Sequence, residues 1–178
     1  MFCLTKPIDS DIARFLERQQ TSRLSYSPSD LPKFTVDRQR VVIGNGPSDF
    51  VAARAALYDW RMFPPAWTRV YSAGPLKVGL SVAVAIQHLG FWSLNGARVL
   101  YELDEEYRSG FAYGTLVDHG ERGEELFAVE MDRETGDVIY NLEAASRPAH
   151  VMAWFGYPYV RELQARFRRD SAAAMMLR

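Results

Sequence analysis

Between Leu76 and Pro148 the sequence shows almost no helical periodicity, and short runs in which apolar residues alternate with polar or small ones are separated by turns. Successive side chains of a strand point to opposite faces of a sheet, so this alternation indicates strands. Short connections favour antiparallel neighbours, and Asp-Arg-Glu-Thr-Gly at 132–136 is typical of a hairpin turn. The stretch therefore predicts an antiparallel meander of about five strands. The strand-like runs are Val78–Leu89, Arg98–Leu103, Gly110–Val117, Glu124–Met131 and Asp137–Ala145.

The hairpin in the middle of this meander has one bulky and one bare face. The bulky face of its first strand carries Phe111, Tyr113, Thr115 and Val117. The bare face carries Ala112, Gly114 and Leu116, and Ala83 and Ala85 lie on a neighbouring strand. A bare strand face usually has another element packed close against it. We expect the C-terminal helix to approach the sheet on this bare face.

Helical periodicity is confined to segments outside the meander. Residues 8–20 predict a short amphipathic helix, and a second helix runs from Ser48 or Asp49 to about Trp60, after a strand at Val36–Ile43. Beyond residue 148 a long helix is expected, with Pro158 in its first turn. The prediction is an α+β fold in which a curved antiparallel meander packs around the C-terminal helix, with a short N-terminal helix. No linker or repeat divides residues 1–178, so we predict a single domain.

The composition and a few sequence patterns argue against several functional classes. The 178 residues carry 21 Lys and Arg against 22 Asp and Glu, and no basic stripe accompanies the aromatic residues, so nucleic-acid binding is not expected. The single cysteine, Cys3, excludes an intramolecular disulfide, and the three histidines have no ligand spacing, so neither a metal nor another cofactor is expected. Without a secretory signal or an apolar run of about 20 residues, the chain predicts a cytoplasmic protein that does not span a membrane. Arginine outnumbers lysine, which favours bidentate recognition of anions.

Several short motifs follow one another along the chain. They are Gly-Asn-Gly at 44–46, Asn-Gly-Ala-Arg-Val-Leu-Tyr at 95–101, Gly-Phe-Ala-Tyr-Gly-Thr-Leu at 110–116, Gly-Glu-Glu at 123–125, Ser-Arg-Pro at 146–148 and Arg-x-x-Gln at 161–164. In this order they resemble uncharacterised protein family 0548, a domain of unknown function found in bacteria and plants; residues 26–34 depart from its pattern. The order of elements is similar to the helix-grip fold of the Bet v 1/START-like superfamily. That resemblance implies a sheet wrapped around a C-terminal helix, with an apolar ligand commonly held between them.

The turn after the first strand of the central hairpin collects titratable groups. His119 stands beside Asp118, and Glu124 and Glu125 follow on opposite faces of the next strand. A histidine and a carboxylate are a proton-transfer arrangement, which makes these three residues, His119, Glu124 and Glu125, the candidate catalytic groups. A solvated turn histidine and a structural ion pair between helix and sheet are the alternative interpretations.

We infer a protein that binds a small apolar or amphipathic molecule in a pocket between the sheet and the C-terminal helix. Scattered polar groups among aromatic side chains are how such sites are built. Candidate ligand-binding residues are Trp60, Trp67, Arg98, Tyr113, Arg147, Tyr157, Arg161 and Gln164. Two alternatives stay open: a hydrolase-, isomerase- or cyclase-like enzyme that uses His119 and a glutamate, and a protein-interaction module without a pocket.

Arg161 and Gln164 stand three positions apart on the expected C-terminal helix, at the edge of its apolar stripe. Arginine there is suited to hold a carboxylate with both nitrogens. We expect Arg161 to meet Glu124 or Glu125 and so to tie the helix to the central hairpin.

Overall fold

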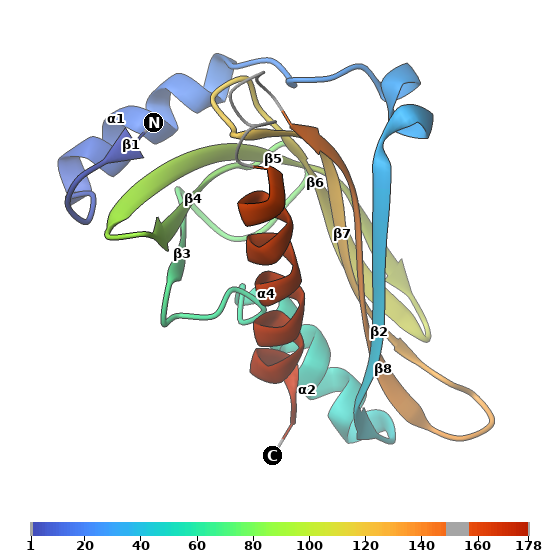
Figure 1. Cartoon of the computed structure of the whole chain (residues 1–178). Helices are drawn as coiled ribbons and strands as arrows, with labels where there is room; N and C mark the ends of the chain where they lie inside the picture. Colours follow the sequence, from blue (N-terminus) through green and yellow to red (C-terminus); the bar gives the residue numbers. More distant parts are fainter. Residues whose placement is uncertain (1, 149–156, 178) are drawn as a thin grey trace.

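The computed structural model describes residues 2–148 and 157–177. Its strands form one curved sheet, and helices lie on both faces of this sheet (Figure 1). The helical segments are α1 (Asp9–Thr21), the 3₁₀ helix η1 (Pro28–Lys33), α2 (Pro47–Tyr58) and α4 (Tyr157–Met175). The strands are β1 (Phe2–Cys3), β2 (Thr35–Asn45), β3 (Thr68–Ser72), β4 (Ser81–His88), β5 (Phe91–Glu105), β6 (Arg108–Thr115), β7 (Glu121–Met131) and β8 (Asp137–Pro148).

The sheet is the expected antiparallel meander. Its order is β2-β8-β7-β6-β5-β4-β3, and β1 pairs with β5 beside this path. The strands β3 to β8 follow one another in space as in sequence, because each is joined to the next by a connection too short for a crossover. The α+β fold with a curved meander, a short N-terminal helix and a C-terminal helix is confirmed.

The face of the sheet that carries α2 and α4, here called the inner face, holds the main core. Phe111 and Phe127 are fully buried there. The ring of Phe167, on α4, lies 6.4 Å from the ring of Phe127 and 5.3 Å from that of Phe63. Tyr140 and Ser171 join β8 to α4 through a hydrogen bond of 2.7 Å between their hydroxyls. In Figure 1 the sheet curves around α4, which runs along this face.

The opposite, outer face carries the N-terminal part of the chain, and here the expectation for the bare face is wrong in one respect. Ala83 and Ala85 pack against Phe15 of α1. At Gly114 a Cβ would lie 2.6 Å from the hydroxyl of Tyr26. The small residues do receive a close neighbour, but it is the N-terminal segment. α4 instead covers the bulky face, because large aromatic side chains are what a core between helix and sheet requires.

Candidate functional site

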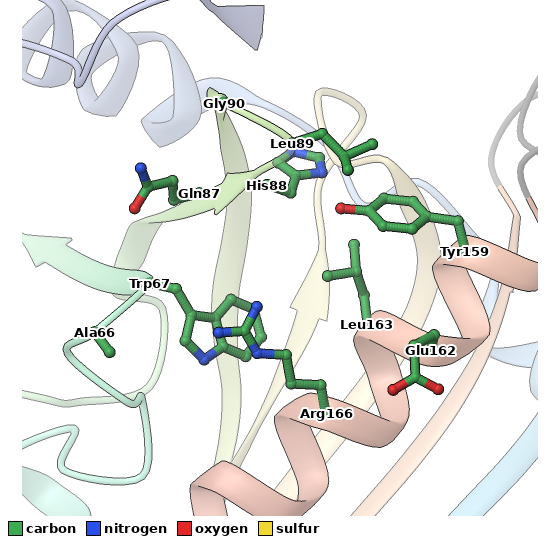
Figure 2. A pocket seen from close by; sticks show the side chains of 10 residues that line it. All are labelled: Ala66, Trp67, Gln87, His88, Leu89, Gly90, Tyr159, Glu162, Leu163 and Arg166. Atoms are coloured by element: carbon green, nitrogen blue, oxygen red, sulfur yellow. The ribbon is translucent and has the colours of Figure 1, made fainter.

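A cavity of about 400 Å³ opens between α4 and the turn that joins β4 to β5. Figure 2 shows side chains of α4 on one side and those of the turn on the other, with Trp67 at the base. Trp67 and Leu163 supply apolar walls, and Leu89, which is 75% exposed, stands at the mouth. The cavity, here called the α4 pocket, is lined by Ala66, Trp67, Gln87, His88, Leu89, Gly90, Tyr159, Glu162, Leu163 and Arg166.

The Trp67 wall of the α4 pocket is fixed by contacts from α4. The indole Nε1 donates a hydrogen bond of 2.9 Å to Asp170 Oδ2. The Arg166 guanidinium lies 4.4 Å from the centre of the Trp67 ring, and its Nε lies 3.4 Å from Asp170 Oδ2. A cation over an aromatic face and a charge-assisted hydrogen bond both restrain the ring. The wall is therefore in place before any ligand arrives.

Two rings face each other across the upper part of the α4 pocket. The His88 and Tyr159 rings are parallel within 2°, with centroids 6.3 Å apart. His88 Nε2 lies 3.2 Å from the Ser93 hydroxyl, and burial lowers the pKa of His88 below its ordinary value. The imidazole is therefore uncharged at neutral pH. The pocket combines flat, apolar surfaces with a charged rim at Arg166 and Glu162.

A second polar site lies deeper on the inner face, at Glu121 and Glu125 of β7, here called the β7 carboxyl pair. Tyr113 donates a hydrogen bond of 2.6 Å to Glu125, and Gln164 donates one of 2.6 Å to Glu121. Burial raises the pKa of Glu125 from 4.5 to about 7. Burial, aided by the charge of Glu125, raises the pKa of Glu121 to the same level. These carboxyl groups therefore exchange protons near neutral pH.

His119 lies beside Glu121. Its Nδ1 accepts a hydrogen bond of 3.0 Å from the backbone N–H of Glu121, so the ring proton of the neutral form sits on Nε2. Burial lowers the pKa of His119 to about 4. In the described part of the chain no hydrogen bond joins its ring to Glu124 or Glu125. Of the two glutamates, Glu125 points to the inner face, whereas Glu124 points outward and accepts a 3.0 Å hydrogen bond from Tyr26.

The expected partner of Arg161 is wrong, although the helix is tied to the sheet as expected. Arg161 holds the carboxylate of Asp37 on β2 with both terminal nitrogens, and the Nη2–Oδ1 distance is 2.8 Å. Arg168 lies 3.5 Å from the same carboxylate. Gln164 donates to Glu121 and, at 3.2 Å, to Ser146 Oγ. α4 crosses closer to β2 and β8 than the sequence indicated, so Asp37 is within reach and Glu124 faces the other way.

Two other predicted ligand-binding arginines lie on the outer face, away from α4. Arg98 donates to the backbone oxygens of Gln19 and Gln20, at 2.6 and 3.0 Å, and so caps the C-terminal end of α1. The guanidinium of Arg147 stacks 5.0 Å from the Phe34 ring. Both residues alternate outward along their strands, so neither can anchor a ligand between sheet and helix.

The predicted aromatic residues are divided between core and pocket. Trp67 lines the α4 pocket. Tyr113 is buried in the core, and Trp60 packs against Phe111 with ring centroids 4.9 Å apart. The side chain of Tyr157 lies outside the described residues.

The sequence interpretation missed Glu121 and Asp37, and it missed the half of the α4 pocket formed by His88, Tyr159 and Arg166. Strand parity held a signal for Glu121, because it shares a face with Glu125 and the core residue Phe127. The pocket held no such signal, since its lining comes from three segments far apart in the chain.

Among the described residues, no group of three or more His, Cys, Asp and Glu side chains is arranged to hold a metal ion. No helix described here is both long and apolar enough to cross a membrane.

The chain is similar in sequence to one protein family and to several of its relatives. The model of the family described as "Domain of unknown function (DUF1990)" matches residues 18–174. A UPF0548 protein of Dictyostelium discoideum is 33% identical over 99% of this chain and 94% of its own length. A UPF0548 protein of Deinococcus radiodurans is 34% identical over 99% of this chain and 98% of its own length.

Solved structures with a similar fold have much lower identity. A hypothetical protein of Helicobacter pylori superposes with a TM-score of 0.62 at 11% identity, covering 88% of this chain and 96% of that protein. Human STARD10 superposes with a TM-score of 0.52 at 9% identity, covering 97% of this chain and 81% of that protein. A norcoclaurine synthase point mutant of Thalictrum flavum was solved with a transition-state analogue. It superposes with a TM-score of 0.50 at 13% identity, covering 78% of this chain and 91% of that protein. These likenesses show the helix-grip fold of START and Bet v 1-like proteins.

Proposed function

The chain belongs to the DUF1990 family and has the helix-grip fold, and on that premise we propose that it binds a small amphipathic molecule in the α4 pocket. The observation that carries the proposal is the cavity of about 400 Å³ between the sheet and α4, apolar at Trp67 and Leu163 and charged at its rim. Ligand sites of this size typically combine apolar walls with a few placed polar groups.

The walls and the rim of the α4 pocket favour different parts of such a ligand. Trp67, Leu163 and Leu89 offer apolar surface that a ligand would cover, and burial of apolar area supplies about 25 cal/mol per Å². Arg166 is 44% exposed and can turn a guanidinium nitrogen toward an anionic group. The ligand that fits best is therefore flat and apolar at one end and anionic at the other.

The test is titration with 8-anilinonaphthalene-1-sulfonate, a probe with an apolar aromatic body and one sulfonate. Leu163→Trp fills the cavity, and we expect it to weaken binding about tenfold or more, measured by fluorescence. Leu163→Met keeps the volume of the side chain and should bind as the unchanged protein does.

Arg166→Gln should weaken the same binding several-fold, because the sulfonate loses its charged partner. Arg38→Gln is the matched control, since Arg38 is 68% exposed on β2, and neither it nor its partner Glu143 lines the pocket. Equal binding by the Leu163→Trp and Leu163→Met variants would overturn the proposal.

A second candidate function, acid–base catalysis on a small molecule, is favoured by the β7 carboxyl pair. A carboxyl group with a pKa near 7 is matched to proton transfer at neutral pH, and Tyr113 holds Glu125 in a fixed position. A norcoclaurine synthase with this fold was solved with a transition-state analogue, so the fold can carry catalysis. With p-nitrophenyl acetate as substrate, Glu125→Gln and His119→Ala should each lower kcat/KM about tenfold or more. Unchanged hydrolysis would argue for binding without catalysis.

A further inference from the structure

A second cavity, of about 470 Å³, lies at the other side of the molecule, where the chain after α1 meets the turn from β6 to β7. It is here called the arginine pocket, and its lining includes Arg23, Ser25, Tyr26, Ser27, Asp30 and Arg122. It shares no lining residue with the α4 pocket. The two cavities are therefore independent candidates for binding.

The backbone around the arginine pocket is held by the sheet. Leu24 forms a bridge with Leu116, and the N–H of Ser25 donates to the carbonyl of Thr115 at 2.9 Å. The N–H of Val117 donates to the carbonyl of Arg23 at 3.3 Å. The segment that carries Arg23 and Ser25 thus continues the sheet beyond the end of β6. A site built on paired backbone holds its side chains in fixed relative positions.

Two guanidinium groups of the arginine pocket have no salt-bridge partner among the described residues. In the described part of the chain neither Arg23 nor Arg122 forms an ion pair, a side-chain hydrogen bond or a ring contact. The single carboxylate in the lining, Asp30, accepts the backbone N–H of Ser27 at 3.2 Å. The lining is therefore net positive, with two planar donor groups that match the oxygens of a phosphate.

The hydroxyl groups of the arginine pocket have defined roles. The hydroxyl of Thr115 lies 3.1 Å from the carbonyl oxygen of Gly123 and accepts the Gly123 N–H at 2.8 Å. In the 2.6 Å hydrogen bond between Ser25 Oγ and Thr115 Oγ1 either hydroxyl can donate, and in both cases at least one lone pair of Ser25 Oγ stays unused. Tyr26 donates its proton to Glu124. Besides cationic donors, the pocket therefore presents acceptors, which suit the hydroxyl groups of a ligand.

We propose that the arginine pocket binds a small hydroxylated phosphate ester, with Arg23 and Arg122 on the phosphate and Ser25 and Tyr26 accepting from ligand hydroxyls. A bare anion would use the guanidinium groups and leave the acceptors empty, and a neutral polyol would leave two cations without a partner. A compound that carries both kinds of group satisfies the whole lining, since unpaired polar groups disfavour binding.

The probe is glycerol 3-phosphate, compared with inorganic phosphate, acetate and glycerol at constant ionic strength, with binding followed through backbone amide resonances in NMR titrations. We expect glycerol 3-phosphate to bind more tightly than inorganic phosphate, and both to shift the amides of Ser25, Ser27 and Val117. Acetate and glycerol should produce little change. Acetate that binds as tightly as phosphate, or no response at these amides, would overturn the proposal.

Variants assign the binding to the two arginines. Arg23→Gln and Arg122→Gln should each weaken glycerol 3-phosphate binding about tenfold, because each removes a charge-assisted contact. Arg133→Gln is the matched control: Arg133 is exposed in the turn between β7 and β8, where it stacks on Tyr107. Leu163→Trp should also leave this binding unchanged, so failure of the α4 pocket and failure of the arginine pocket are told apart. Equal loss in Arg133→Gln would mean nonspecific attraction and would overturn the assignment.

The same phosphate chemistry is found on lipid headgroups, and a vesicle arm separates the two sources. Phosphatidylcholine vesicles with phosphatidic acid should retain no more protein on sedimentation than vesicles without it. Retention on these vesicles, together with no binding of free glycerol 3-phosphate, would overturn the assignment of a small soluble ligand.

Discussion

At Gly114 of β6 the sheet lies close to the chain that follows α1. A Cβ at this position would lie 2.6 Å from the Tyr26 hydroxyl and 2.9 Å from Leu24 Cδ2. Tyr26 lies against this strand while its hydroxyl holds Glu124. The absence of a side chain at residue 114 is therefore what lets Tyr26 reach Glu124.

Gly114→Ala should destabilise the protein by about 1–3 kcal/mol, because the added methyl group overpacks the site and displaces Tyr26 from Glu124. Gly120→Ala is the comparison, since a Cβ there has its nearest heavy atom, Asn95 Oδ1, at 3.8 Å. That change should fall within about 0.5 kcal/mol. Urea unfolding of both variants measures the difference, and equal stabilities would contradict this account.

The direction of individual side chains was readable from strand parity where the parity was certain. Alternation placed Glu124 and Glu125 on opposite faces, and their hydrogen bonds to Tyr26 and Tyr113 lie on opposite faces. Parity does not say which face is the inner one. For that, the identity of the covering element is needed, and residue-scale patterns do not contain it.

At the scale of elements, the meander and the C-terminal helix could be predicted because local periodicity and short connections determine them. The face of the sheet on which α4 packs could not be predicted from these local patterns. The bare face of β6 suits a close neighbour, but α1 and the residues after it take that place. The contact between Arg161 and Asp37 joins residues 124 positions apart, and nothing local to either residue encodes it.

The ion pair between Arg161 of α4 and Asp37 of β2, here called the strap, joins the C-terminal helix to the edge strand of the sheet. Arg161 is 32% exposed and Asp37 16%, so the pair is only partly screened by solvent. Arg161→Ala should cost about 2 kcal/mol, less than for a fully buried pair because Arg168 still faces Asp37.

The control for this strap is Arg169→Ala. The pair that Arg169 forms with Glu162 spans 3.4 Å and both side chains are more than 60% exposed, at 63% and 69%. Its loss should cost less than about 1 kcal/mol. A double-mutant cycle of Arg161→Ala and Asp37→Ala isolates the coupling, and a coupling near zero would show that the pair does not hold the helix.

At the scale of the whole molecule, buried titratable groups make folding depend on pH. Burial raises the pKa of Glu121 and of Glu125 from 4.5 to about 7, so between these values the folded protein holds protons that the unfolded chain has released. Stability from these groups therefore falls as pH rises from about 4.5 to about 7. Burial lowers the pKa of His119 from 6.5 to about 4, so its contribution rises with pH in that window. The pKa of His88 is also lowered by burial, so this imidazole acts in the same direction as His119. The two raised carboxyl pKa values together outweigh these two imidazoles, and the net stability falls.

Glu125→Gln tests this balance. The variant removes one of the two groups that take up a proton on folding and keeps an oxygen that can accept from Tyr113. A pKa raised from 4.5 to about 7 corresponds to at most about 3 kcal/mol. Urea unfolding between about pH 5 and 8 should therefore show a loss of stability with rising pH that is largely abolished in Glu125→Gln, because the remaining pKa shifts of Glu121 and His119 oppose each other. Glu143→Gln, at a carboxylate 42% exposed on the outer face, should leave the slope unchanged. If Glu125→Gln and the unchanged protein lose stability equally across this range, the Glu125 carboxyl does not hold its proton in the folded state.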